Sequence, residues 1–241
     1  MVSRKEWDAL AKDFEREVCD ITRETRTDRI DRIVRRLNPS PQTSVLADLG
    51  CGLGTFIARY GDRFAHAIGV EHAPRIIARA RRALKGRKVR WLTSSLPPAA
   101  RRIGPVADLA VCMNVITMPQ RRVRDAMWRS LARVTRPGGH ALIVVPSIES
   151  DRMVERIAYG TSAAEAKAAS PDGLVERGGA RQKHFAKDEL RALLGAHGFR
   201  VATIERVTYP WQKEGLRKPR NAGSRMPYDW LVLAEKVANS E

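Results

Sequence analysis

The stretch that decides the fold is Val45-Leu-Ala-Asp-Leu-Gly-Cys-Gly-Leu-Gly-Thr-Phe-Ile57. A strand-sized apolar run, residues 45–49, ends at the first of three glycines, Gly50, Gly52 and Gly54, and a helix-like segment begins at Thr55. Glycines in such a turn allow positive φ angles and let a ligand approach the backbone without a Cβ clash. The N–H groups at the start of the helix favour a negatively charged ligand group. The stretch therefore predicts a strand, a ligand-binding loop and a helix.

The rest of the chain continues this alternation of strand and helix patterns. Further strand-like runs are expected at residues 67–70, 89–92, 107–113, 140–145, 199–207 and 228–235, and helices at residues 55–60, 74–84, 121–134 and 187–196. Short strands that alternate with helices are typical of a parallel sheet covered on both faces. The sequence therefore predicts an α/β fold.

Three segments lie outside the regular alternation. Residues 1–43 carry helical patterns at 5–18 and 28–37, the second with Thr27 as its N-cap, and we expect an N-terminal helical cap segment there. Residues 147–186 show no clear strand, and residues 208–227 are rich in Pro, Gly, Lys and Arg. Both are expected to be long loop insertions over the substrate site of a domain at 44–241, because long loops are more often functional than not.

Composition excludes several classes of protein. With 241 residues, 43% of them hydrophobic, the chain can bury a core, and no apolar run is long enough to span a bilayer. Residues 1–12 lack the apolar stretch of a secretory signal. The three cysteines (Cys19, Cys51 and Cys112) are odd in number and widely spaced, which fits neither a disulfide framework nor a zinc site. We therefore expect reduced thiols, a cytoplasmic location and no metal.

The glycine spacing separates the possible ligands. A dinucleotide fold requires G-x-G-x-x-G and a P-loop requires Gly-Lys-Ser/Thr, but this loop reads D-x-G-x-G-x-G from Asp48. That pattern resembles motif I of the class I S-adenosylmethionine-dependent methyltransferases, and residues 44–145 follow the family's order of motifs. The resemblance implies a Rossmann-like, seven-stranded, mostly parallel sheet with a final antiparallel strand and helices on both faces. It also implies S-adenosyl-L-methionine as cofactor and S-adenosyl-L-homocysteine as product.

The resemblance assigns further cofactor-binding residues. Glu71 comes seventeen residues after Gly54, at the end of an apolar run, where a carboxylate can accept hydrogen bonds from both ribose hydroxyls. The alternative is a surface Glu that caps the next helix. Ser95 stands where the family's acidic residue usually meets the adenine amino group. The full expected set is Asp48, Gly50, Cys51, Gly52, Gly54, Glu71, His72, Ser94 and Ser95, with Asn114 and Val115 beside the methionine moiety.

Methyl transfer from a sulfonium mainly requires alignment of nucleophile, methyl and sulfur in a dry pocket. A general base is needed only when the nucleophile must lose a proton, so the catalytic group stays unassigned, with His184 as the candidate base. More often such a His is structural. We expect a methyltransferase that acts on a small molecule. Two alternatives stay open: an RNA methyltransferase, and a non-catalytic binding or scaffold protein with this fold, which the serine at 95 favours.

The formal net charge of +17, with 34 Arg against 10 Lys, suggests an acidic partner such as nucleic acid. However, residues 114–117 read Asn-Val-Ile-Thr rather than Asn/Asp-Pro-Pro-aromatic, so the motif of base-amine methyltransferases is missing. Arginines on the outer helices are expected to face solvent. The loop with Lys213, Arg217, Lys218, Arg220 and Arg225 is expected near the pocket, where it either receives an anionic acceptor or is simply solvated. Nucleic acid is therefore not favoured, and the sequence does not give the oligomeric state.

Overall fold

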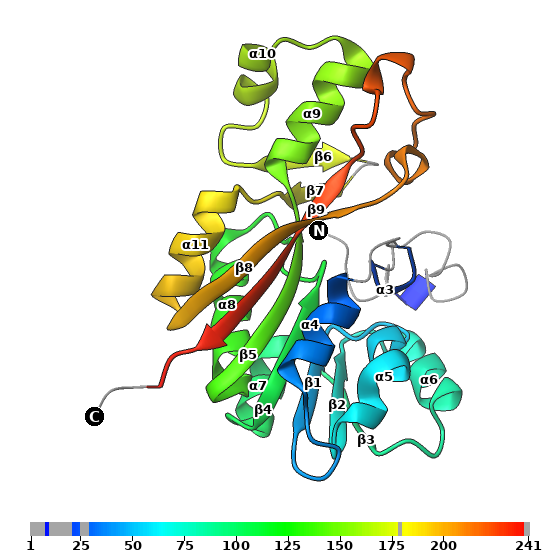
Figure 1. The fold of residues 1–241 in the computed structure, drawn as a ribbon, viewed down its shortest axis with the longest axis vertical. Coiled ribbons are helices and arrows are strands. Elements are labelled where there is room, and N and C mark those ends of the chain that lie inside the picture. Colours follow the sequence, from blue (N-terminus) through cyan, green and yellow to red (C-terminus); the bar gives the residue numbers. More distant parts are fainter. Residues whose placement is uncertain (1–7, 10–20, 25–28, 178–179, 239–241) are drawn as a thin grey trace.

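A computed structural model of the chain describes residues 8–9, 21–24, 29–177 and 180–238 (Figure 1). Most of the helix predicted at residues 5–18 lies outside the described residues. The same is true of Cys19 and of Thr27, the predicted N-cap. The described part of the N-terminal segment forms α3 (Ile21–Glu24) and α4 (Arg29–Leu37), the second close to the predicted 28–37. Ile30 and Val34 of α4 are buried against one face of the sheet, which explains their helical spacing.

Seven strands form one sheet in the order β3-β2-β1-β4-β5-β9-β8. The pairs β1–β2, β2–β3, β1–β4 and β4–β5 are parallel, whereas β9 is antiparallel to both β5 and β8. This topology confirms the predicted mostly parallel sheet with a final antiparallel strand. The strands are β1 (Val45–Leu49), β2 (His66–Glu71), β3 (Val89–Thr93), β4 (Ala107–Met113), β5 (Thr135–Pro146), β8 (Phe199–Thr208) and β9 (Tyr228–Lys236).

Helices cover both faces of the sheet, as expected (Figure 1). An apolar core lies on each face of the sheet. Side chains of β4 alternate between them, with Ala110 and Cys112 in the first core and Leu109 and Val111 in the second. The first core also holds side chains of α7, α8 and α11, and the second holds those of α3, α4 and α5. The helices are α5 (Thr55–Tyr60), continued by a 3-10 turn, η2 (Gly61–Arg63), then α6 (Pro74–Ala83), α7 (Leu96–Ile103), α8 (Arg121–Val134) and α11 (Lys187–Ala196).

The expectation that residues 147–186 are loop was wrong. The segment forms α9 (Ile148–Tyr159), α10 (Ala163–Ala168) and a hairpin of β6 (Leu174–Arg177) and β7 (Ala180–Lys183). Local capping explains both helices, because Ser147 accepts the N–H of Ser150 and Ser162 forms a capping box with Glu165. The sequence analysis also missed α7, which begins after Ser95 with prolines in its first turn.

Residues 209–227 are loop, as predicted, with short 3-10 turns η3 (Trp211–Glu214) and η4 (Arg220–Ala222). Trp211 and Ala222 pack with Val154 and Ile157 of α9 in a small core of their own. We call residues 147–186 and 209–227 together the insertion lobe. Asp229 lies opposite Pro146, the last residue of β5, so this lobe stands at the carboxyl edge of the parallel strands (Figure 1). Among the described residues, no helix is both long enough and apolar enough to cross a membrane.

Candidate active site

The glycine loop lies where the strand order reverses, between β1 and its neighbours β2 and β4. Ligands of open α/β sheets bind outside the carboxyl strand ends at such a switch point. Gly50, Gly52 and Gly54 have φ angles of 81°, 51° and 75°, and Gly54 is the N-cap of α5. The N–H groups of Gly50 and Cys51 both donate to the carbonyl of Val70, which holds the loop against the end of β2.

Val115 lies against this loop. A Cβ at Gly50 would come within 2.3 Å of Val115 Cγ2, so a larger residue at position 50 would displace the segment that follows β4. Two positions expected to meet the cofactor, far apart in sequence, are therefore in contact.

Glu71 is 7% exposed at the end of β2, which excludes the surface position considered as an alternative. Its Oε2 accepts the N–H of Gly52 at 3.3 Å, and its Oε1 accepts the N–H of Ala73 at 2.8 Å. His72 Nδ1 lies 2.9 Å from the same Oε1. The carboxylate is therefore fixed at the glycine loop by backbone donors without any ligand.

Two further loop residues are buried in this region. Asp48 lies on β1, in register with Gly69 of β2 and Val111 of β4. Burial, together with the carboxylates of Asp48 and Glu71, raises the pKa of the Cys51 thiol well above its ordinary value. Cys51 is therefore a neutral thiol inside the loop and not an activated nucleophile.

Ser94 and Ser95 follow β3 at the same edge. The N–H of Ser94 donates to the carbonyl of Glu71 at 3.0 Å, so the segment expected near adenine adjoins the end of β2. The Ser94 hydroxyl donates to the carbonyl of Ser95. Ser95 is exposed and stands at the N-cap of α7 without a capping hydrogen bond from its side chain.

Asn114 follows β4 with a φ of 54°, and its Nδ2 donates to Asp229 Oδ2 at 3.0 Å. Asp229 is 5% exposed, and burial raises its pKa to about 6, with Glu214 adding to the rise and the Asn114 and Tyr209 hydrogen bonds opposing it. Tyr209 donates to Glu214 at 2.8 Å. Sequence reasoning missed Asp229 as a site residue. The available signal was a carboxylate inside the apolar final strand Tyr-Asp-Trp-Leu-Val-Leu.

Backbone hydrogen bonds bring His184 to the same edge. Lys183 N–H donates to the carbonyl of Thr117, and Phe185 N–H donates to the carbonyl of Pro146. The N–H of His184 itself donates to the carbonyl of Gly173. The segment 183–185 thus lies between the chain leaving β4 and the chain leaving β5, which places His184 at the active edge as expected without giving it a role.

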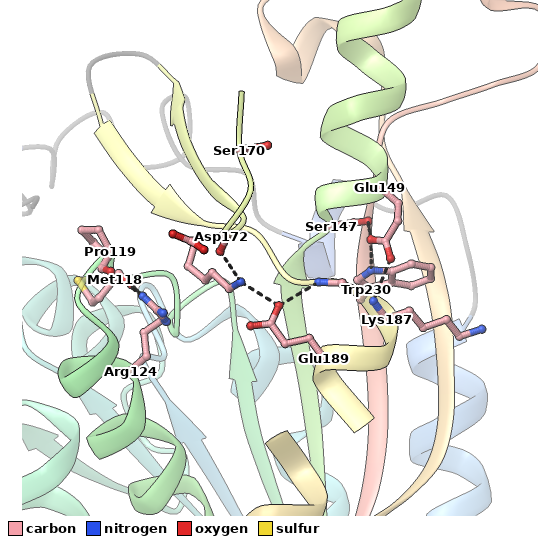
Figure 2. Close-up of polar contacts among 12 residues, drawn as sticks. Met118, Pro119, Arg124, Ser147, Glu149, Ser170, Asp172, Lys187, Glu189 and Trp230 are labelled. Carbon is pink, nitrogen blue, oxygen red and sulfur yellow. Dashed lines mark hydrogen bonds and ion pairs between the residues drawn. The ribbon is translucent and has the colours of Figure 1, made fainter. Parts of the chain in front are cut away.

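Charged side chains to which the sequence analysis gave no role anchor the insertion lobe and the segment after β4 (Figure 2). Lys183 is 5% exposed, and its Nζ donates to the carbonyl of Asp172 and to Glu189 Oε2, both at 2.8 Å. Arg124 donates to the carbonyls of Met118 and Pro119 beyond β4. Glu149 accepts hydrogen bonds from Ser147, from the Trp230 indole and from the backbone of Lys187.

A cavity of about 340 Å³ lies at the opposite edge of the sheet, lined among others by Ile57, Phe64 and Val89. Phe64 and Val89 adjoin the amino ends of β2 and β3, away from the residues described above. Within the described ranges, no group of three or more His, Cys, Asp and Glu side chains has an arrangement that could hold a metal ion.

Residues 46–139 match the family model of a methyltransferase domain. The chain is similar in structure to a putative S-adenosylmethionine-dependent methyltransferase from Listeria monocytogenes, at 14% identity and a TM-score of 0.62, over 86% of this chain and 96% of that one. It is also similar to the 1,6-didemethyltoxoflavin-N1-methyltransferase of Burkholderia thailandensis, crystallised with 1,6-didemethyltoxoflavin and S-adenosylhomocysteine. That match has 18% identity and a TM-score of 0.64, over 98% of this chain and 87% of the other.

A third similar structure is the magnesium protoporphyrin IX methyltransferase of Synechocystis with bound S-adenosylmethionine, at 14% identity and a TM-score of 0.60, over 97% of this chain and 94% of that one. No curated protein matches the chain in sequence. Residues 46–139 are therefore a methyltransferase domain, and the chain has the fold of the class I S-adenosylmethionine-dependent methyltransferases. The cofactor of that family is S-adenosyl-L-methionine.

Proposed function

We propose that this chain transfers a methyl group from S-adenosyl-L-methionine to a small molecule. The observation that carries the proposal is the buried Glu71 carboxylate, which hydrogen-bonds to Gly52 of the glycine loop. Glu71 Oε2 accepts the Gly52 N–H and has a second lone pair that can accept a ribose hydroxyl, whereas Oε1 already lies against the Ala73 N–H and His72 Nδ1. Because backbone donors already fix the side chain, binding costs little rotamer entropy.

The remaining expected residues surround this point. We propose that the loop of Asp48, Gly50, Cys51, Gly52 and Gly54 holds the amino-acid end of the cofactor, and that His72, Ser94 and Ser95 border the adenine. Asn114 and Val115 would then lie beside the methionine sulfur, since Val115 contacts Gly50. When bound, the cofactor supplies the activated methyl group, and the protein supplies alignment and exclusion of water.

The packing of the aromatic side chains favours a small molecule over RNA. Single-stranded nucleic acid binds by stacking its bases on accessible aromatic rings. Four aromatic residues flank the basic loop. Trp211, Tyr228 and Trp230 are buried in apolar cores, and the half-buried Tyr209 donates a hydrogen bond to Glu214. The cations of that loop, by contrast, are exposed (Lys213, Arg217, Lys218, Arg220 and Arg225), which suits an anionic group on the acceptor.

Calorimetric titration with S-adenosylmethionine and S-adenosylhomocysteine tests the proposal. We expect Glu71→Ala to weaken both by about 10-fold or more, because hydrogen bonds to a charged group are lost. Glu235→Ala is the matched control, because the Glu235 carboxylate pairs with Arg200 near the opposite edge of the sheet. This variant should bind both ligands with wild-type affinity. Absence of binding by the folded wild type would favour a scaffold protein instead.

RNA binding is measured separately. An RNA methyltransferase would bind single-stranded RNA with an affinity that falls steeply with salt, because phosphate contacts release counterions. We expect no saturable binding at physiological salt. A steep salt dependence that weakens when the five loop cations are replaced by Gln would favour the RNA alternative.

A further inference from the structure

The side-chain amide of Asn114 is paired at one end only. Its Nδ2 donates to Asp229, but its Oδ1 is shielded from solvent and has no hydrogen-bond donor among the described residues. A buried acceptor without a donor costs free energy, and native structures contain few of them. The unpaired oxygen therefore marks a place where a ligand donor is expected.

Asp229 fixes which end of the amide stays unpaired. An ionised carboxylate only accepts hydrogen bonds, so the amide must turn its NH₂ group toward Asp229 and its carbonyl oxygen away. The charged and titratable groups that face this carboxylate are Glu214 and Tyr209, and Asn114 is its amide partner. Asn114 is also one of two non-glycine residues with positive φ in the described chain, the other being Asn38.

The location of the pair relates it to the methyl acceptor. On one side of Asn114, the next residue, Val115, contacts Gly50 of the cofactor loop. On the other side, Asp229 lies opposite Pro146, at the carboxyl end of β5 and beneath the insertion lobe. The amide thus lies between the proposed donor side and the lobe.

We propose that Asn114 Oδ1 accepts a hydrogen bond from an N–H of the methyl acceptor, that Asp229 is the positioning residue for this amide, and that the methylated atom is the nitrogen of a neutral amino group on the acceptor. This inference rests on the proposed function. The nitrogen lone pair forms the bond to the methyl carbon, and the C–S bond breaks with its electron pair going to sulfur. The resulting methylammonium releases its extra proton to water, so no protein base is required. A carboxylate acceptor has no hydrogen to donate and would be repelled by Asp229.

Sinefungin is the probe, because a carbon that bears an ammonium group replaces the methyl sulfonium and puts N–H donors at the position of the methyl group. We expect the wild type to bind sinefungin about 10-fold or more tightly than S-adenosylhomocysteine, since a charged hydrogen bond is added. Asn114→Gly keeps the positive φ without the side chain and should abolish this preference, which is the ratio of the two affinities and is read independently of any change in the S-adenosylhomocysteine affinity itself. Asn38→Gly is the matched control and should retain the preference.

The pH profile separates positioning from a merely structural role. Below about pH 6, a protonated Asp229 can itself donate, so the amide is free to turn its oxygen toward it. The preference for sinefungin should therefore fall between pH 7 and pH 5 in the wild type and be independent of pH in Asp229→Asn. Retention of the preference by Asn114→Gly, or the same pH profile in Asp229→Asn, would overturn the inference. If the folded protein binds neither ligand, the proposed function itself fails.

Discussion

Gly50 and Val115 approach so closely that a methyl group at Gly50 would lie 2.3 Å from Val115 Cγ2 and 2.9 Å from Cγ1. This contact joins the loop after β1 to the segment after β4, and it is possible only because position 50 has no side chain. The same residue also needs its φ of 81°, which a residue with a Cβ adopts at a cost.

Gly50→Ala should therefore combine backbone strain with overpacking. Gly86→Ala is the matched control, because Gly86 has a φ of 89° but nothing within 4 Å of its added Cβ. We expect Gly86→Ala to lower the free energy of unfolding by about 1–2 kcal/mol, and Gly50→Ala to lower it by about 1–3 kcal/mol more. Urea denaturation measures both, and adding Val115→Ala should recover part of the excess. Equal losses in the two glycine variants would contradict the steric explanation.

Lys183 and Glu189 form an ion pair of which the lysine side is buried, 6% exposed against 36% for Glu189. Glu189→Gln leaves the ammonium buried without a counter-charge and should lower the free energy of unfolding by about 3 kcal/mol. Lys183→Met leaves a carboxylate that water can reach, so its cost should be smaller. Arg200→Met removes an exposed pair and should change stability by less than about 1 kcal/mol. A larger loss of unfolding free energy in Lys183→Met than in Glu189→Gln would show that the lysine end of the pair is not desolvated.

Asp229 should make stability depend on pH. Burial raises the pKa of Asp229 from 3.8 to about 6, so the folded chain binds a proton more readily than the unfolded chain. The stabilisation of the folded state by protonated Asp229 is fully present below pH 3.8 and is lost as the pH rises through 6. Asp229→Asn should therefore be more stable than the wild type at pH 8, by about 3 kcal/mol at most, with the difference vanishing near pH 4.

Urea denaturation at several pH values between 4 and 8 checks this prediction. Asp188→Asn is the control, at an exposed position in the first turn of α11. It should show no gain in the free energy of unfolding at pH 8 relative to pH 4. A variant at position 229 that is less stable than the wild type at pH 8 would indicate that the ionised Asp229 is well solvated.

The cofactor side of the fold could be predicted from the sequence because its information is local. The three glycines and Glu71 follow consecutive strands, and parallel strands bring their carboxyl ends to the same edge. The helices of the insertion lobe were missed although Ser162-Ala-Ala-Glu165 is a readable capping box. Alanine-rich and polar segments such as α10 lack the apolar stripe on which the helix prediction relied.

The acceptor side could not be predicted in the same way. Asn114 and Asp229 are 115 residues apart and meet because β9 enters the sheet antiparallel, beside β5, in one particular register. Shifting that register by one residue would turn Asp229 to the other face of the sheet. Strand order and register are tertiary properties that local periodicity does not contain.

The small core of Val154, Ile157, Trp211 and Ala222 is separate from the two cores that flank the sheet. A segment that buries its apolar side chains mainly within itself can open as a cooperative unit, at a free energy below that of global unfolding. The amide hydrogens of α9 should consequently exchange with deuterium faster than those of β4 and β5. Because Asp229 lies at the base of this lobe, opening of the unit would expose the Asn114–Asp229 pair to water without unfolding the sheet.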